Sequence, residues 1–128
     1  MNATRCVRWL SAAFVAGVLA APACVHARAP ATPLAEVAVA TLPAEAREVL
    51  AHVRTGGPFR YERDGVVFGN REHQLPEAKR GYYHEYTVPT PGAKSRGARR
   101  VVCGGPRTAP DACFYTGDHY RTFARIRE

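Results

Sequence analysis

A carboxylate and an imidazole stand side by side in the segment GYYHEY, residues 81–86. Its aromatic residues and its alternation predict a strand. Because successive side chains of a strand point to opposite faces, Glu85 shares a face with Tyr83 and Thr87, whereas His84 lies on the other. We therefore interpret Glu85 as a candidate acid or base whose partner is not its sequence neighbour.

Two arginines have the spacing to reach the same face as Glu85. Arg96 and Arg100 share one parity at the start of the next predicted strand, so a hairpin would bring them beside the carboxylate. One interpretation is a cross-strand ion-pair network, which is the common case. The other is a phosphate site, in which the arginines bind a phosphoryl group and Glu85 acts as the general base.

A general acid is needed if Glu85 is a base, and His119 is the candidate. It lies in TGDHY, residues 116–120, a tight turn predicted between the last two strands. A histidine presented by a loop on a rigid sheet suits proton transfer, although a lone loop histidine is most often a bystander. Only His119 lies in a conspicuous turn and also has an acidic and an aromatic neighbour. The competing histidines are His26, His52, His73 and His84.

A second loop, FGNRE at residues 68–72, has the groups that a guanine pocket needs. Phe68 could stack on the base. Glu72 could accept from the ring N1–H and the exocyclic amine, a donor pair that adenine lacks on this edge, while backbone N–H groups reach O6. An ordinary polar loop is the alternative for any such pentapeptide taken alone.

The elements that must position these residues are one helix and several strands. Residues 43–55 predict a helix that begins at Pro43 and is stopped by Gly56, with an apolar stripe at Ala46, Val49, Leu50 and Val53. Asp64-Gly65 predicts a tight hairpin. The sequence therefore predicts an α+β fold, an N-terminal helix packed on a single antiparallel β-sheet. The predicted strands are residues 59–68, 82–88, 98–103, 113–115 and 120–127.

The first 27 residues are typical of a signal peptide. A positive start precedes an apolar run, residues 9–21, which is too short to span a membrane. Cys24 leaves a lipoprotein as an alternative, although AAPAC matches a lipobox poorly. Residues 28–40, rich in Ala and Pro, predict a flexible leader, and residues 41–128 predict one small domain.

The charge balance favours a polyanionic partner. The chain of 128 residues has 18 basic and 11 acidic residues, and without Arg5 and Arg8 the mature form has 16 against 11, a net charge of +5. Nearly all the cations are Arg, which suits bidentate contact with phosphate. Generic basicity is the alternative that composition leaves open.

Two cysteines, Cys103 and Cys113, remain in the predicted domain. In an oxidising compartment they could form a disulfide, and two buried thiols are the alternative. Two cysteines without a histidine pair at ligand spacing do not predict a zinc site.

Taken together, these segments resemble the small secreted guanyl-specific microbial ribonucleases, the group that contains barnase and the Streptomyces ribonucleases, with the latter the closer match. The resemblance runs from about Leu42 to Ile126. Its motifs, in order, are LPAEA, GGPFRYERDGVVFGNRE, LP, GYYHEYTVPTPGAKSRGARRVVCG and YTGDHY.

The resemblance implies cleavage of single-stranded RNA on the 3′ side of guanosine. The 2′-hydroxyl attacks the phosphate to give a 2′,3′-cyclic phosphate, which water opens to a 3′-phosphate. By resemblance Glu85 is the general base, His119 the general acid, and Arg96 and Arg100 stabilise the transition state. The base-recognition positions are Phe68, Gly69, Asn70, Arg71, Glu72 and Tyr120.

The same resemblance implies no metal or other cofactor, a monomer without stable membrane association, and a small acidic protein inhibitor in the producing cell. Two departures concern Gly69, where relatives have a larger polar residue, and the terminal disulfide of relatives, which this chain lacks. A link between Cys103 and Cys113 is the candidate replacement for it. The alternatives in function are a non-catalytic module that binds RNA or another polyanion, and the same nuclease used as an antibacterial toxin.

Overall fold

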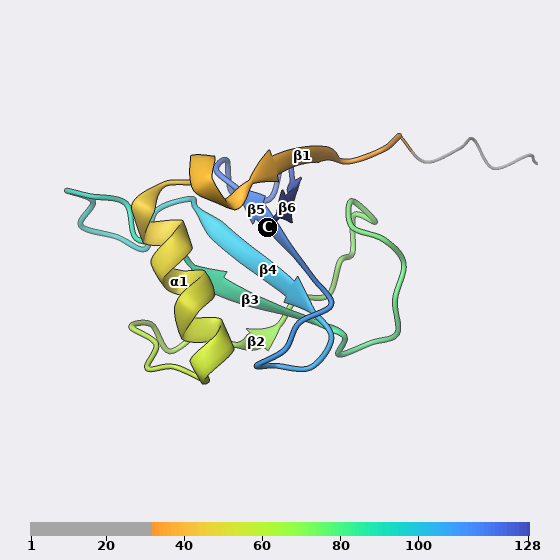
Figure 1. Cartoon of the computed structure of the whole chain (residues 1–128), viewed down its shortest axis with the longest axis horizontal. Helices are drawn as coiled ribbons and strands as arrows, with labels where there is room; N and C mark the ends of the chain where they lie inside the picture. The colour runs from red at the N-terminus through yellow and green to blue at the C-terminus, as the bar shows by residue number, and fades with distance from the viewer. Residues whose placement is uncertain (1–31) are drawn as a thin grey trace, which may run out of the picture. The chain divides into compact units, whose positions relative to one another are not determined.

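The computed structural model describes residues 32–128, which form one helix on a six-stranded sheet (Figure 1). The predicted signal peptide and the first residues of the predicted leader lie outside the described residues. No helix within residues 32–128 is long and apolar enough to cross a membrane. The elements are β1 (Ala35–Ala38), the 3-10 turn η1 (Val39–Thr41), α1 (Ala44–Thr55), β2 (Val66–Val67), β3 (Tyr83–Thr87), β4 (Arg100–Gly104), β5 (Ala112–Thr116) and β6 (Ala124–Arg127).

The strands follow the order β1-β6-β5-β4-β3-β2. Every pairing is antiparallel except that of β1 with β6, which is parallel and sets Ala35 opposite Ala124. The predicted α+β class and the helix-on-sheet packing are confirmed, and the sheet is mixed at this one edge.

The flexible leader predicted over residues 28–40 is wrong from Ala35 onward. Ala35–Ala38 form β1, and an ion pair between Glu36 and Arg127 joins this strand to β6. The Ala- and Pro-rich composition carries little strand propensity of its own. The segment is ordered because the last strand of the chain supplies its backbone partners, so the described domain begins before residue 41.

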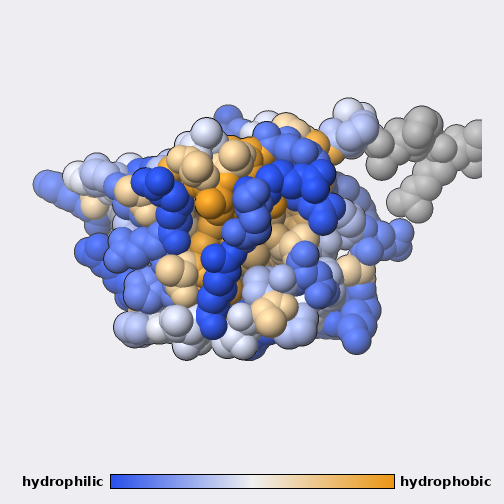
Figure 2. All heavy atoms as spheres, in the orientation of Figure 1, coloured by the Kyte–Doolittle hydropathy of each residue, from blue (hydrophilic) through white to orange (hydrophobic). Residues whose placement is uncertain are grey.

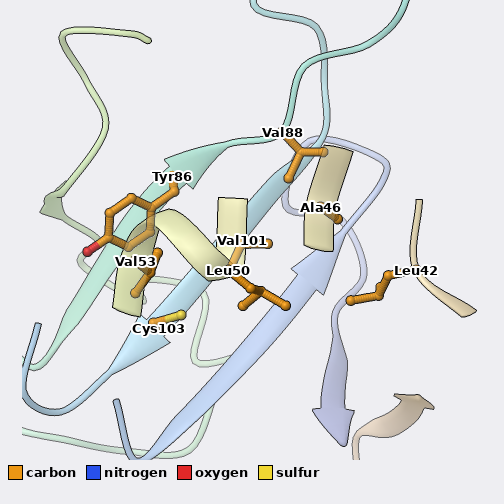
Figure 3. Packing of buried hydrophobic residues seen from close by; sticks show 8 residues of the cluster. All are labelled: Leu42, Ala46, Leu50, Val53, Tyr86, Val88, Val101 and Cys103. Carbon is orange, nitrogen blue, oxygen red and sulfur yellow. The ribbon is translucent and has the colours of Figure 1, made fainter. Parts of the chain in front are cut away.

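The helix packs on one face of the sheet through the predicted apolar stripe (Figure 3). Pro43 is its N-cap, and Gly56 ends it in the left-handed conformation, with φ 79°. Ala46, Leu50 and Val53 are buried, and Val49 lies at the border of the cluster. Their partners on the sheet side are Tyr86, Val88, Val101 and Cys103.

Beyond the helix the same face carries an apolar strip between hydrophilic borders (Figure 2). A hollow of about 420 Å³ lies there, lined by Leu50 and Val53 of α1, Cys113 of β5 and Ile126 of β6. The strip is thus apolar at its centre, while Arg54, Asp111 and Glu128 also line the hollow.

The opposite face has its own small core, formed by Leu75, Tyr83, Val102, Phe114 and Phe123. Glu85 is two residues from Tyr83 on β3 and pairs with Val102 on β4, so it belongs to this face. The predicted separation of Glu85 from His84 by strand alternation is thereby confirmed.

The tight hairpin predicted over residues 59–68 is wrong. Residues before Val66 form turns, and only Val66–Val67 pair with β3. The Asp64 carboxylate decides this, because its Oδ2 accepts from the Tyr61 N–H (3.1 Å) and its Oδ1 from the Thr87 N–H (2.7 Å). The Asp-Gly turn is thus tied to β3 rather than to a strand of its own.

A disulfide joins Cys103 of β4 to Cys113 of β5, directly opposite each other in the sheet. The predicted bridge is confirmed. It closes the loop of residues 104–112 over a separation of ten residues.

Replacing both bridged cysteines with alanine should lower the free energy of unfolding by about 2–3 kcal/mol, because the unfolded chain regains the freedom that closing a loop of this length removes. Urea unfolding of the wild type and of the variant measures the difference. Dithiothreitol should bring the wild type down to the variant and leave the variant unchanged. Equal unfolding midpoints without reductant would contradict this expectation.

Candidate active site

A buried carboxylate lies at the centre of the sheet face opposite α1. Glu85 is in the middle of β3, between Val66 of β2 and Val102 of β4, and is 6 % exposed. Burying an ionised group is costly unless charges and hydrogen bonds compensate for it. The surroundings of Glu85 supply both.

The two oxygens of Glu85 have different partners. Oε2 accepts a hydrogen bond from the Tyr120 hydroxyl at 2.8 Å. Oε1 lies 3.8 Å from Arg96 Nη2 and 3.8 Å from Arg63 Nε. These guanidinium nitrogens are close enough for ion pairs but stop short of hydrogen-bond distance.

Arg100 reaches Glu85 through Tyr120. The Arg100 side chain is 2 % exposed, and its Nη1 donates to the carbonyl oxygens of Gly97 (2.9 Å) and Arg99 (2.7 Å). Its Nε donates to the Tyr120 hydroxyl at 3.1 Å. Since β4 pairs Arg100 with Thr87, the expected shared face is confirmed, but Arg100 is two residue pairs along the ladder from Glu85.

Tyr120 is the group that links the carboxylate to the guanidinium. Burial raises the pKa of its hydroxyl, and the hydrogen bond to Glu85 raises it further. The hydroxyl therefore stays protonated at neutral pH and donates to Glu85.

Arg96 presents an unused donor. Its Nε donates to the Thr87 hydroxyl at 2.8 Å, which fixes the guanidinium plane. Its Nη2 is buried without a hydrogen-bond partner among the described residues. A buried donor without an acceptor is unfavourable, and an anionic oxygen would satisfy it.

His119 is presented by the turn between β5 and β6. His119 and Tyr120 both have left-handed backbone angles, φ 57° and 67°, which non-glycine residues rarely adopt. The His119 N–H donates to the Ala98 carbonyl at 3.0 Å. The imidazole is exposed, with its ring centre 4.9 Å from that of Tyr120, the residue that binds Glu85.

Asp118 holds this turn together. Its Oδ1 accepts from the Thr116 hydroxyl (3.0 Å) and the Thr122 N–H (2.9 Å), and its Oδ2 accepts from the Thr122 hydroxyl (2.7 Å). The hydrogen bonds from Thr122 are the main reason that the pKa of Asp118 falls to about 2. The carboxylate therefore stabilises the turn that carries His119.

A cleft of about 840 Å³ runs from the loop of residues 68–72 to Glu85. Seven of the ten predicted site residues line it: Phe68, Gly69, Asn70, Arg71, Glu72, Glu85 and Tyr120. Arg96, Arg100 and His119 do not line this cleft. They surround its inner end through their contacts with Glu85, Thr87 and Tyr120.

Within the loop, Phe68 and Asn70 have structural contacts. The Phe68 ring stacks on Tyr120 at 5.4 Å and meets the edge of Phe123 at 5.9 Å. The Asn70 amide donates to the Leu75 carbonyl (2.9 Å) and accepts from the Leu75 N–H (3.0 Å). Asn70 thus shapes the loop, and its side-chain amide is already engaged.

The other recognition residues are open to solvent. Gly69, Arg71 and Glu72 are exposed, so the Glu72 carboxylate is free to meet a ligand in the cleft. A Cβ at Gly69 would make ordinary contacts with the Arg71 side chain, at 3.6 Å and 3.7 Å. The position therefore has room for the larger residue that the resemblance led us to expect in relatives.

Four residues that line the cleft were not predicted as site residues: Arg63, Val67, Gln74 and Arg80. Arg63 was assigned to a strand of a hairpin that does not form. The Asp64-Gly65 signal could have placed it at a turn, but which strand that turn contacts depends on the tertiary structure.

His84 lies on the other face, as strand alternation predicted. It is 9 % exposed and lies opposite Cys103. Burial lowers its pKa, and the charge of Arg107 lowers it further, so it is neutral at pH 7. Among residues 32–128, no group of three His, Cys, Asp or Glu side chains could hold a metal ion.

The Asp118 contacts predict a pH dependence of stability. A carboxyl whose pKa falls from 3.8 to about 2 on folding stabilises the protein above pH 3.8, and that stabilisation is lost as the pH falls through about 2. We expect the Asp118→Asn variant to be less stable than the wild type at pH 6, with the difference shrinking below pH 3.8. Chemical unfolding across this range measures it, and a constant difference would contradict it.

Comparison with known proteins identifies the family. A family model described as ribonuclease matches residues 26–127. The chain is 52 % identical over 90 residues to guanyl-specific ribonuclease Sa of Kitasatospora aureofaciens, covering 70 % of this chain and 91 % of that protein. It is 49 % identical over 88 residues to guanyl-specific ribonuclease St of Saccharopolyspora erythraea, covering 69 % and 83 %.

A solved structure shares the fold. The crystal structure of ribonuclease Sa2 with guanosine-2′-cyclophosphate is 48 % identical in sequence, with a TM-score of 0.68 over 74 % of this chain and 97 % of that chain. Other structures of ribonuclease Sa2 include one with 3′-GMP. The buried carboxylate, the arginines around it and these matches lead to one conclusion: the chain belongs to the ribonuclease family.

Proposed function

We propose that this protein is a secreted guanyl-specific endoribonuclease that cleaves single-stranded RNA 3′ to guanosine. The observation that carries the proposal is the cleft that leads from the exposed Glu72 to the buried, arginine-flanked Glu85. The names of the relatives, guanyl-specific ribonucleases, and the guanine nucleotides bound to ribonuclease Sa2 support it.

The first step is transesterification. Glu85 takes the proton of the 2′-hydroxyl, the O2′–P bond forms, and His119 protonates the 5′-oxygen as the P–O5′ bond breaks. The product is a 2′,3′-cyclic phosphate. In the second step His119 removes a proton from water and the water oxygen attacks phosphorus. The P–O2′ bond breaks, and Glu85 returns a proton to the leaving O2′.

Arg96 and Arg100 stabilise the charge that develops on the phosphate oxygens between these bond changes. Arg96 Nη2 is a buried donor without a hydrogen-bond partner among the described residues, so a phosphate oxygen would satisfy it. Arg100 is fixed by two carbonyl oxygens and Tyr120, and therefore needs little reorganisation during the reaction.

The guanine base occupies the outer part of the cleft. Glu72 accepts from N1–H and the exocyclic amine, while Phe68 and Tyr120 supply the aromatic surface. Asn70 holds the loop in shape through Leu75 and so acts as a positioning residue. Gly69 and Arg71 complete the wall.

The protein acts outside the cytoplasm as a monomer, without a cofactor, and the producing cell makes a small acidic inhibitor. The N-terminal segment with its apolar run and the Cys103–Cys113 bridge support export. The formal net charge of +7 for the whole chain supports an acidic protein partner as well as RNA.

Substitution of either acid–base residue should abolish most of the activity. Glu85→Ala and His119→Ala should each lower kcat on a guanosine dinucleotide by a factor of about 10² or more. His84→Ala is the matched control, because it removes an imidazole from the other face, and it should retain turnover at temperatures where it is folded. Loss of activity in His84→Ala with retention in His119→Ala would overturn the assignment of the acid.

Substrate choice is tested with GpC and ApC dinucleotides in EDTA. We expect cleavage of GpC alone, with a cyclic phosphate appearing before the 3′-phosphate, and Glu72→Ala should lose the preference because the N1–H and amine donors lose their acceptor. Cleavage of neither dinucleotide, with RNA binding intact, would favour a non-catalytic RNA-binding module instead. Killing of competing bacteria by the secreted protein would favour the toxin alternative.

A further inference from the structure

Arg63 is a third guanidinium at the reacting carboxylate, supplied by a different part of the chain from Arg96 and Arg100. It comes from the turn before β2, lines the cleft, and places its Nε 3.8 Å from Glu85 Oε1. Arg96 Nη2 lies at the same distance from the same oxygen. Two guanidiniums therefore converge on one oxygen from two loops.

The backbone that carries Arg63 is held firmly against β3. The Gly65 N–H donates to the Glu85 carbonyl at 2.7 Å, and the Val66 N–H donates to the Arg63 carbonyl at 3.3 Å. One residue from Arg63, Asp64 accepts from the Thr87 N–H. The Cα of Arg63 is thus fixed relative to the catalytic strand by contacts that its own side chain does not make.

The Arg63 side chain approaches from the solvent side of the site. It is 66 % exposed, whereas the side chain of Arg96 is 26 % exposed and the residue Arg100 is 2 % exposed. A ligand entering the cleft would therefore pass Arg63 and come to rest with Arg96 and Arg100 behind it. The ion pair with Glu85 is loose, so the donors of Arg63 remain available to a closer anion.

The charges around Glu85 exceed what one carboxylate needs. The guanidiniums of Arg63 and Arg96 face a single carboxylate that also accepts from Tyr120, and Arg100 donates to the same Tyr120 hydroxyl. Positive charge in excess of one carboxylate is suited to a group whose negative charge grows during the reaction. The phosphate of the ribonuclease reaction is such a group.

We propose that Arg63 is a further catalytic residue, which donates hydrogen bonds to a non-bridging oxygen of the reacting phosphate from the solvent-exposed side of the site. This inference rests on the proposed function. Arg63 gives up no proton in the reaction; the proton of O2′ goes to Glu85 and the 5′-oxygen receives its proton from His119, as before. Its contribution is positive charge beside the non-bridging oxygens, where negative charge grows in the pentacoordinate transition state.

The test is Arg63→Gln, with Arg60→Gln as the matched control. Arg60 is an exposed arginine of the same segment that lies outside the cleft, and its removal changes the net charge equally. We expect Arg63→Gln to lower kcat/KM on GpC by about tenfold. This loss is smaller than is usual for removing a transition-state hydrogen-bond donor, because the Arg63 side chain is largely exposed. Arg60→Gln should equal the wild type, and Arg63→Lys should lie between.

Equilibrium binding separates a phosphate contact from a structural effect. By calorimetry, Arg63→Gln should bind 3′-GMP about tenfold more weakly than the wild type while its affinity for guanosine, which lacks the phosphate, is unchanged. Equal weakening for both ligands would indicate a distorted cleft and would overturn the proposal. The proposal would also be overturned if Arg63→Gln had the same 3′-GMP affinity and the same kcat/KM as Arg60→Gln.

Failure of the proposed function would look different. If the wild type cleaved no guanosine dinucleotide, the proposed reaction would be wrong, and Arg63 would be judged on 3′-GMP and guanosine binding alone. Selective loss of 3′-GMP affinity would then support the phosphate contact, and unchanged affinity would overturn it.

Discussion

The buried carboxylate of Glu85 is the constraint on which the rest of the site depends. An ionised group at the middle of a sheet is tolerated only where charges and donors surround it. The Tyr120 hydroxyl meets one oxygen, and Arg63 and Arg96 approach the other. Arg100 donates a hydrogen bond to the Tyr120 hydroxyl. Each partner comes from a different loop or strand, so the fold must bring distant segments together before the charge can be accommodated.

Short polar side chains hold the loops in the required positions. Asp64 accepts two backbone N–H groups and ties the turn before β2 to β3. The Asn70 amide closes the recognition loop, and Asp118 closes the turn that carries His119. Asn70, His119 and Tyr120 have left-handed backbone angles. Strained backbone therefore coincides with the predicted site and is maintained by side chain–backbone hydrogen bonds.

Sequence reasoning succeeded where one local rule decided the outcome. Strand alternation placed Glu85 and His84 on opposite faces, and the 3.6-residue period identified the buried stripe of α1. It failed where the partner lay far along the chain. β1 has little strand propensity and forms because β6 pairs with it. The pairing joins Ala35 to Ala124, which lies 89 residues later in the chain. The Asp64-Gly65 turn likewise closed onto β3 instead of a neighbouring strand.

The sequence by itself determined the residue types, the face of each strand residue and the motifs that mark the family. These depend on local periodicity and chemistry, which need no knowledge of distant contacts. Only the tertiary structure decided that Tyr120 bridges Arg100 to Glu85, that Arg96 keeps a buried donor unused, and that Arg63 reaches the carboxylate. Those contacts join segments far apart in the chain, and their geometry is set by the register of the sheet and the closure of its loops.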